Sequence, residues 1–200
     1  MTDKTPYIKE HIEEHSADSR IAFGFWMYLM TDFVLFASLF AVFAVLRGNT
    51  FGGPSGADIF NMPYVLVETL LLLTSSVTSG FALLAARANK KPLVFLFLII
   101  TFILGAAFVS MEVSEFARLA LAGTGWWSSG FLSSYFTLVG THGLHVTLGL
   151  VWMLILMLAI ATQGLTHSNL RKLELLNMFW HFLEIIWIFI FVIVYLLALV

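Results

Sequence analysis

Five long apolar segments limit what this chain can fold into. Each is long enough to cross about 30 Å of hydrocarbon as a helix that rises about 1.5 Å per residue. Of the 200 residues, 60% are hydrophobic and 11% are charged, which leaves too little polar surface for a soluble domain of this size. The sequence therefore predicts an all-α integral membrane bundle of five transmembrane helices, over residues 21–46, 63–86, 92–116, 131–161 and 175–199.

The segment that precedes the first span is polar and carries both signs of charge. It lacks the basic start and short apolar core of a cleavable signal, so we expect the first span to remain as an anchor. We expect residues 1–20 to form a polar cytoplasmic tail and residues 21–200 to form a single transmembrane domain. Proline is favoured in the first turn of a helix, which suits Pro63 and Pro92, and Asn61 is a plausible N-cap.

Orientation follows from the lysines and arginines that lie between the spans. One side of the predicted bundle carries Lys4, Lys9, Arg20, Arg87, Lys90, Lys91, Arg171 and Lys172. The other side carries Arg47 and Arg118. Because cytoplasmic loops hold an excess of lysine and arginine, the N-terminus is expected in the cytoplasm and the C-terminus on the far side.

Eight ionisable residues lie inside the apolar segments, and these are the candidate functional residues. They are Asp32, Glu68, Glu112, Glu115, His142, His145, His181 and Glu184. Six of them form three pairs spaced i, i+3, so each pair lies on one face of its helix. A charge at bilayer depth costs about 2.5–3.5 kcal/mol, so we expect these faces to converge inside the protein as a buried polar seam. Their positions along the helices differ in depth, which favours a ladder over one compact site.

The residues alone leave two readings of this seam open. Polar side chains hold membrane helices together, and the serines and threonines in residues 74–80 fit that role. Carboxyl and imidazole groups in series can also relay or buffer protons.

Other site chemistries find less support in the spacing. A di-iron site needs Glu-x-x-His on two helices, whereas this chain has one reversed His181-x-x-Glu184. A haem between His142 or His145 and His181 is conceivable, but nothing in the spacing requires it. The chain has no cysteine for a thiolate ligand or nucleophile. The absence of internal repeats argues against a transporter. We therefore predict no catalytic, cofactor-binding or metal-ligating residue.

Two motifs resemble the signature stretches of a known family, subunit III of haem–copper respiratory oxidases. They are Thr-His-Gly-Leu-His-Val at residues 141–146 and Trp-His-Phe-Leu-Glu-Ile-Ile-Trp at residues 180–187. Glu-Val-Ser-Glu at residues 112–115 is similar to the family's Glu-x-x-Glu, and Met-Thr-Asp at residues 30–32 resembles its buried carboxylate. The resemblance runs from Phe23 onward. Glu184 is a departure, because the family more often has aspartate there. Asp32 is the shorter acid where cytochrome c oxidase relatives usually have glutamate.

The five-helix form narrows the resemblance. Residues 52–60, followed by residues 65–69, are similar to subunit III of bacterial bo-type ubiquinol oxidases, in which subunit I supplies two further helices. The resemblance implies a non-catalytic subunit of a proton-pumping quinol oxidase in the bacterial cytoplasmic membrane, with a periplasmic C-terminus. Subunit I would be the main partner and would hold haem and copper, with subunits II and IV as further partners. Phospholipid held between helices, stabilisation of subunit I and support of proton uptake are also implied. The alternatives are subunit III of a cytochrome c or menaquinol oxidase and, more remotely, a stand-alone membrane metalloenzyme.

Overall fold

The computed structural model describes residues 5–54 and 56–199, and most of these are helical. Its helices are α1 (Thr5–Leu46), α2 (Gly56–Ile59), α3 (Met62–Arg87), α4 (Lys91–Leu121), α5 (Gly130–Gln163) and α6 (His167–Ile190), continued by the π-helical turn η1 (Phe191–Leu196) and the short 3₁₀ helix η2 (Leu197–Leu199). Within the described residues, five helices are long and apolar enough to cross a membrane, which confirms the predicted all-α membrane fold.

The chain divides into two units, and the division falls inside α1. The first unit is Met1–Leu35 and the second is Phe36–Val200. The first unit consists, where it is described, of α1 from Thr5 onward. The second unit holds the end of α1 together with α3, α4, α5 and α6, and the packing described below lies within it. The assignment of residues 21–200 to a single domain stays a prediction.

The helices extend beyond the apolar segments that predicted them. The helix α1 begins at Thr5, inside the predicted polar tail, and α6 begins at His167, eight residues before the predicted position 175. Hydropathy marks where a helix crosses hydrocarbon, but backbone hydrogen bonding continues wherever the sequence tolerates it. Polar residues such as Arg171 and Glu174 therefore belong to the helix that precedes the apolar stretch of α6.

The N-termini of the helices match the expected proline positions but not the expected N-cap. The prolines lie in the first turns of α3 and α4, as expected, but the Asn61 side chain makes no cap hydrogen bond. Side-chain caps occur instead at Ser129, which accepts from the Leu132 amide, and at Thr166, which accepts from the Asn169 amide.

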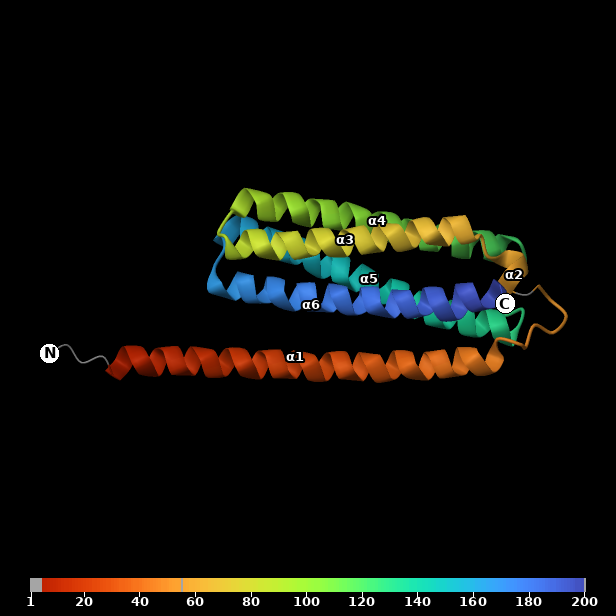
Figure 1. The fold of residues 1–200 in the computed structure, drawn as a ribbon, viewed down its shortest axis with the longest axis horizontal. Helices are drawn as coiled ribbons and strands as arrows, with labels where there is room; N and C mark the ends of the chain where they lie inside the picture. The colour runs from red at the N-terminus through yellow and green to blue at the C-terminus, as the bar shows by residue number, and fades with distance from the viewer. Residues whose placement is uncertain (1–4, 55, 200) are drawn as a thin grey trace. The chain divides into compact units, whose positions relative to one another are not determined.

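Helices α3 to α6 run alongside one another in the second unit. The α3–α4 and α5–α6 turns lie at one end, and α2 lies with the α4–α5 loop at the other (Figure 1). The α3–α4 turn is short, and Asn89 adopts a left-handed backbone with φ of 55°, a conformation that asparagine tolerates better than most residues. Because the α3–α4 and α5–α6 turns lie at the same end of the bundle, that end carries the basic residues Arg87, Lys90, Lys91, Arg171 and Lys172.

The indole of Trp180 lies where α6 meets the other three helices of this group. It is 1% exposed, and its Nε1 donates to Ser75 Oγ of α3 at 3.0 Å. The ring lies over Gly105 of α4 and Gly149 of α5, where an added Cβ would come within 2.9 Å and 3.0 Å of ring carbons. Two glycines thus make room for one large ring, and small residues of this kind let membrane helices approach closely.

We predict that Gly105→Ala destabilises the folded chain, because the new methyl group would displace the Trp180 ring. Overpacking of this kind costs about 1–3 kcal/mol. Gly80→Ala is the matched control, since Gly80 is also helical and an added Cβ there meets nothing within 4 Å. Thermal unfolding of the detergent-solubilised protein measures both variants. Equal stability of the two would contradict the described packing.

Candidate functional site

A ladder of side-chain hydrogen bonds joins α6 to α3. Donors on α6 lie on one helical face, at spacings of three and seven residues, and each reaches a hydroxyl group on α3. The steps are Asn177 Nδ2 to Ser79 Oγ at 2.9 Å, Trp180 Nε1 to Ser75 Oγ at 3.0 Å, and Trp187 Nε1 to Thr69 Oγ1 at 3.1 Å. The two tryptophans therefore act as polar contacts as well as apolar filling.

His181 and Glu184 complete this ladder through Ser76. The Ser76 hydroxyl donates to Glu184 Oε2, and its oxygen lies 2.5 Å from His181 Nδ1. Because the single hydroxyl hydrogen is directed to the carboxylate, His181 must carry a hydrogen on Nδ1 to complete the contact. The direct distance from His181 Nδ1 to Glu184 Oε2 is 3.7 Å.

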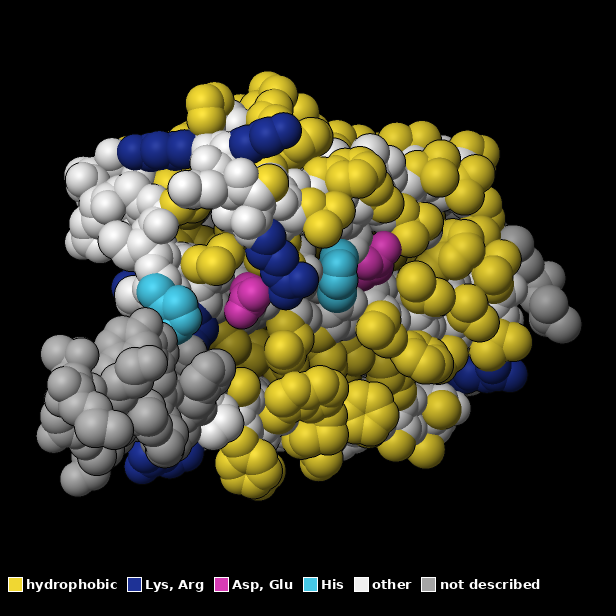
Figure 2. All heavy atoms as spheres, turned by 60° about the vertical axis from the view of Figure 1, so that its left-hand side comes forward, with side chains coloured by type: hydrophobic (Ala, Val, Ile, Leu, Met, Phe, Trp, Pro, Cys, Tyr) yellow, Lys and Arg dark blue, Asp and Glu magenta, His cyan; other side chains and the backbone are white. Residues whose placement is uncertain are grey.

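This group lies at the edge of the bundle. The side chain of His181 is 45% exposed and that of Glu184 is 18% exposed, so the expected full burial of the pair is not found in the chain by itself. Figure 2 shows that hydrophobic side chains cover much of the molecule's surface in this view, with few histidine or acidic side chains among them.

Three carboxyl groups form a second cluster, and all three side chains are buried. Glu68 of α3 is 0% exposed, and Glu112 and Glu115 of α4 are 3% and 2% exposed. The three groups lie close enough to interact electrostatically. Both oxygens of Glu68 and of Glu112 are buried without a hydrogen-bond partner. The Glu112 carboxyl rests on Gly143 of α5, where an added Cβ would lie 2.6 Å from both oxygens, so a side chain there would displace the carboxyl.

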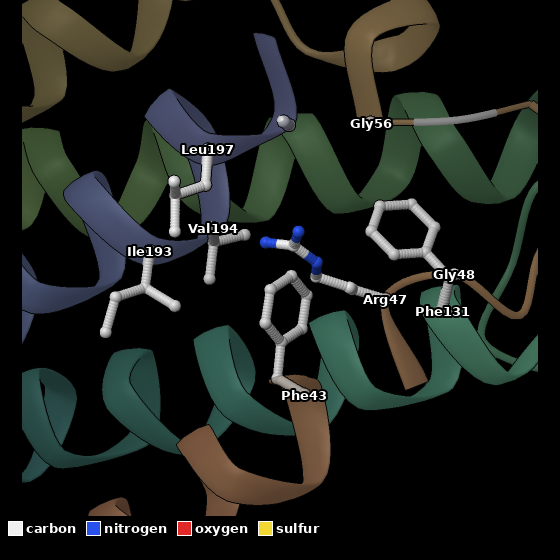
Figure 3. Close-up of a pocket in the computed structure, with 9 residues that line it drawn as sticks. Phe43, Arg47, Gly48, Gly56, Phe131, Ile193, Val194 and Leu197 are labelled. Carbon is white, nitrogen blue, oxygen red and sulfur yellow. The ribbon is translucent and has the colours of Figure 1, made fainter. Parts of the chain in front are cut away.

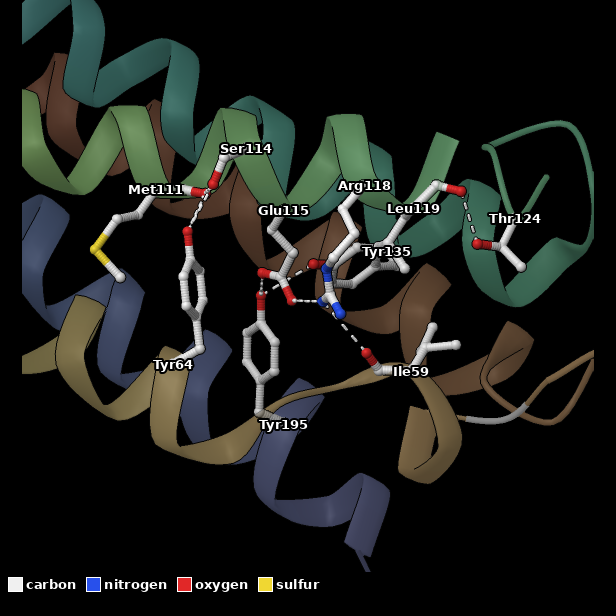
Figure 4. Close-up of polar contacts among 10 residues, drawn as sticks. All are labelled: Ile59, Tyr64, Met111, Ser114, Glu115, Arg118, Leu119, Thr124, Tyr135 and Tyr195. Carbon is white, nitrogen blue, oxygen red and sulfur yellow. Dashed lines mark hydrogen bonds and ion pairs between the residues drawn. The ribbon is translucent and has the colours of Figure 1, made fainter. Parts of the chain in front are cut away.

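Tyrosine and arginine side chains surround Glu115. Tyr195 donates to Glu115 Oε2 at 3.4 Å, and its hydroxyl lies 3.1 Å from that of Tyr135 (Figure 4). Arg118 Nη2 lies 3.6 Å from Glu115 Oε1 and also donates to the Ile59 carbonyl at 3.5 Å. The cluster therefore draws on α3, α4, α5 and η1.

The predicted seam is thus divided into separate environments. His142 is buried, donates from Nε2 to the Leu183 carbonyl at 3.2 Å, and packs against the Phe108 and Trp187 rings. His145 turns away, with Nδ1 2.7 Å from the Thr141 carbonyl one turn earlier on its own helix. Asp32 belongs to the first unit, where it shares a hydrogen bond with Tyr28.

Several residues of these two groups were not identified from the sequence. Tyr135 and Tyr195 gave no signal, because a tyrosine in an apolar span is equally typical of a packed core or a membrane interface. In the sequence, Arg118 is only one of the basic residues that indicate the orientation of the chain in the membrane. The serines of α3 were recognised as helix contacts, but their spacing could not show which helix they face.

Two cavities lie at the α2 end of the second unit. The first, of about 190 Å³, has Arg47 pointing in among Phe43, Phe131 and Val194 (Figure 3). The second, of about 170 Å³, is lined by Asn61, Tyr64, Ser114, Glu115 and Arg118. Among the described residues, no group of three or more His, Cys, Asp or Glu side chains is arranged to hold a metal ion.

Comparison with known proteins gives one consistent family. Residues 7–199 match the model for "Cytochrome c oxidase subunit III". The chain is 55% identical over 189 residues to "Cytochrome bo(3) ubiquinol oxidase subunit 3" of Pseudomonas aeruginosa, covering 94% of this chain and 90% of the relative. It is 52% identical to the protein of the same name from Pseudomonas putida, over 92% and 89% of the two chains. It is 44% identical to "Cytochrome c oxidase subunit 3" of Bacillus sp. (strain PS3), over 88% and 86%.

We predict that Ser79→Ala weakens the α3–α6 contact, because it leaves the buried Asn177 amide without its acceptor. Hydrogen bonds between membrane helices contribute about 0.6 kcal/mol on average and up to about 1.7 kcal/mol. The double variant Ser79→Ala/Asn177→Leu should lose less stability than the two single losses added together. Thermal unfolding in detergent measures this, with Thr74→Ala as control, since Thr74 is exposed and bonds only to the Leu70 carbonyl of its own helix. Strictly additive losses would count against the contact.

Proposed function

The chain belongs to the cytochrome c oxidase subunit III family, and from this premise we propose that it is the third subunit of a ubiquinol oxidase. The carrying observation is 55% identity over 94% of the chain to a relative named as subunit 3 of a cytochrome bo(3) ubiquinol oxidase. The lower identity of 44% to a cytochrome c oxidase subunit 3 favours quinol over cytochrome c as the electron donor. The competing proposal is that the chain is subunit 3 of a cytochrome c oxidase.

We propose a non-catalytic role, in which a partner, subunit I, holds haem and copper. Several polar side chains support that role, because they bond to other groups of the same chain. Ser76 ties the His181 imidazole to Glu184, and His142 is bonded to a backbone carbonyl. The chain would stabilise subunit I, hold phospholipid and support proton uptake by the complex.

The exposed part of the His181–Glu184 pair supports a partner at this face. A polar group at bilayer depth is costly against lipid and is expected to face protein. Ile185 and Ile188, on the neighbouring turn of α6, are also exposed, at 53% and 42%. We propose that a helix of subunit I covers this face, with subunits II and IV completing the complex.

The orientation proposed from the basic residues fits the arrangement of the turns. The α3–α4 and α5–α6 turns share one end of the second unit (Figure 1). This end carries five lysines and arginines at positions 87–91 and 171–172. We propose that it faces the cytoplasm of a bacterial cell and that the C-terminus lies in the periplasm.

We predict that the affinity-tagged chain, extracted in mild detergent from its host membrane, carries a haem- and copper-containing partner with it. The purified complex should oxidise a ubiquinol analogue faster than reduced cytochrome c. Visible spectra, metal analysis and oxygen consumption measure these outcomes. Faster oxidation of cytochrome c would favour the competing assignment. Stoichiometric haem or metal on the chain freed of its partners would overturn the non-catalytic role.

We predict that Glu184→Ala lowers the yield of the assembled complex, because it removes one acceptor of Ser76 and leaves His181 without its acid. Glu174→Ala is the matched control, because Glu174 pairs with Arg87 near the helix end and both side chains are exposed, at 41% and 59%. An exposed pair of that kind contributes about 0–1 kcal/mol, so its loss should leave the yield unchanged. The ratio of partner haem to tagged chain after purification is the measurement. Equal yields from the two variants would count against an interface at His181 and Glu184.

A further inference from the structure

The buried cluster of three carboxyl groups has fewer positive charges beside it than acidic groups within it. Glu68, Glu112 and Glu115 face one another from α3 and α4, within an apolar span. In the part of the chain that the structure describes, the charged or titratable groups that adjoin them are Tyr64 of α3, Arg118 of α4, Tyr135 of α5 and Tyr195 of η1, and His142 precedes the Gly143 that the Glu112 carboxyl contacts. Of these, Arg118 is the one permanent cation, and it lies beside Glu115.

The charge balance limits how many of the three acids are ionised together. An unpaired carboxylate in an apolar interior is strongly disfavoured and takes up a proton instead. One guanidinium balances one carboxylate, so the arrangement accommodates Glu115 as the ion and Glu68 and Glu112 as neutral acids. Both oxygens of each neutral acid remain without a protein partner.

A route to water begins at Glu115. The cavity of about 170 Å³ beside it is lined by polar side chains and has room for several water molecules. At its mouth, the Tyr64 hydroxyl lies 2.6 Å from Ser114 Oγ, and the Arg118 side chain is 55% exposed.

The acids continue inward from this cavity along both helices. Glu68 follows Tyr64 by four residues on α3, and Glu112 precedes Glu115 by three on α4, so each acid lies one turn deeper on the same face. The Tyr195 and Tyr135 hydroxyl groups adjoin Glu115 and supply further groups that can donate and accept protons (Figure 4).

We propose that Glu68, Glu112 and Glu115 form a proton-binding site that exchanges protons with the solution at the Asn61 end of the bundle, through the cavity at Tyr64 and Ser114. In the release direction, a neutral Glu112 or Glu68 gives its proton, through hydroxyl groups or water, to the Glu115 carboxylate, which passes it on to water in the cavity. Uptake runs in reverse and returns the proton to the acid that had lost it. Each bound proton removes one negative charge from the cluster, and each released proton restores it. This site lies at the end opposite the basic turns and goes beyond the proposed function as an oxidase subunit.

The test is infrared difference spectroscopy of the purified membrane complex. The carbonyl-stretch band of protonated carboxylic acids should shift when water is replaced by D₂O and should weaken as the solution is made alkaline. Glu112→Gln and Glu68→Gln should each remove about half of the part of this band that belongs to the cluster. Glu174→Gln is the matched control, because Glu174 is an exposed acid in an ion pair outside the cluster, and it should leave the band unchanged.

A second variant tests the route without removing an acid. Ser114→Phe places a large apolar side chain in the cavity, and the D₂O shift should become several-fold slower while the band keeps its full intensity. If Glu112→Gln or Glu68→Gln fails to fold, the shift in the wild type and its rate in Ser114→Phe still decide the matter. A band that ignores both pH and D₂O, or an unchanged rate in Ser114→Phe, would overturn the proposal.

Haem content and quinol oxidation of the same preparations separate this proposal from the one before it. A complex that contains haem but shows no exchanging carboxyl band keeps the oxidase assignment and removes the proton site. A chain that purifies without haem but shows the exchanging band keeps the proton site and removes the oxidase assignment.

Discussion

The contact between α3 and α6 is the interaction on which the rest of the second unit depends. Lipid tails are as apolar as leucine side chains, so burial of apolar surface gives membrane helices little reason to associate. Hydrogen bonds from Asn177, Trp180 and Trp187 to hydroxyl groups of α3 supply the missing specificity. Because the Trp180 ring also fills the space left by Gly105 and Gly149, the same contact sets the distance of α6 from α4 and α5.

The two clusters that contain acidic side chains in the second unit differ in how much of their surface this chain buries. The Glu68, Glu112 and Glu115 side chains are buried among α3, α4, α5 and η1, and Gly143 of α5 leaves room for the Glu112 carboxyl. The Ser76, His181 and Glu184 group has its hydrogen bonds but remains open on one side. Closure of the first group within the chain favours an internal chemical role. The open side of the second favours a role in assembly.

The sequence predicted the fold well because span length and hydropathy follow from bilayer thickness alone. It also placed Glu112 with Glu115, and His181 with Glu184, on shared faces through the i, i+3 spacing. Spacing within one helix cannot show which neighbour a face meets, so the division into two polar groups could not be foreseen. The different surroundings of His142 and His145 could not be foreseen either. Two residues spaced i, i+3 point about 60° apart on a helix of about 3.6 residues per turn, so they can meet different neighbours.

The contacts of Gly143 give a physical reason for the glycine in the family motif. In His-Gly-Leu-His, Gly143 matters because the Glu112 carboxyl occupies the space that any other side chain would need. Two of the stretches that carry the family resemblance, at residues 112–115 and 141–146, therefore contact each other between α4 and α5. The resemblance reflects packing around a buried acid as much as the acids themselves. Glu112 is a buried acid at a position where an apolar residue would pack at lower cost in a membrane, and this cost argues for a role beyond holding two helices together.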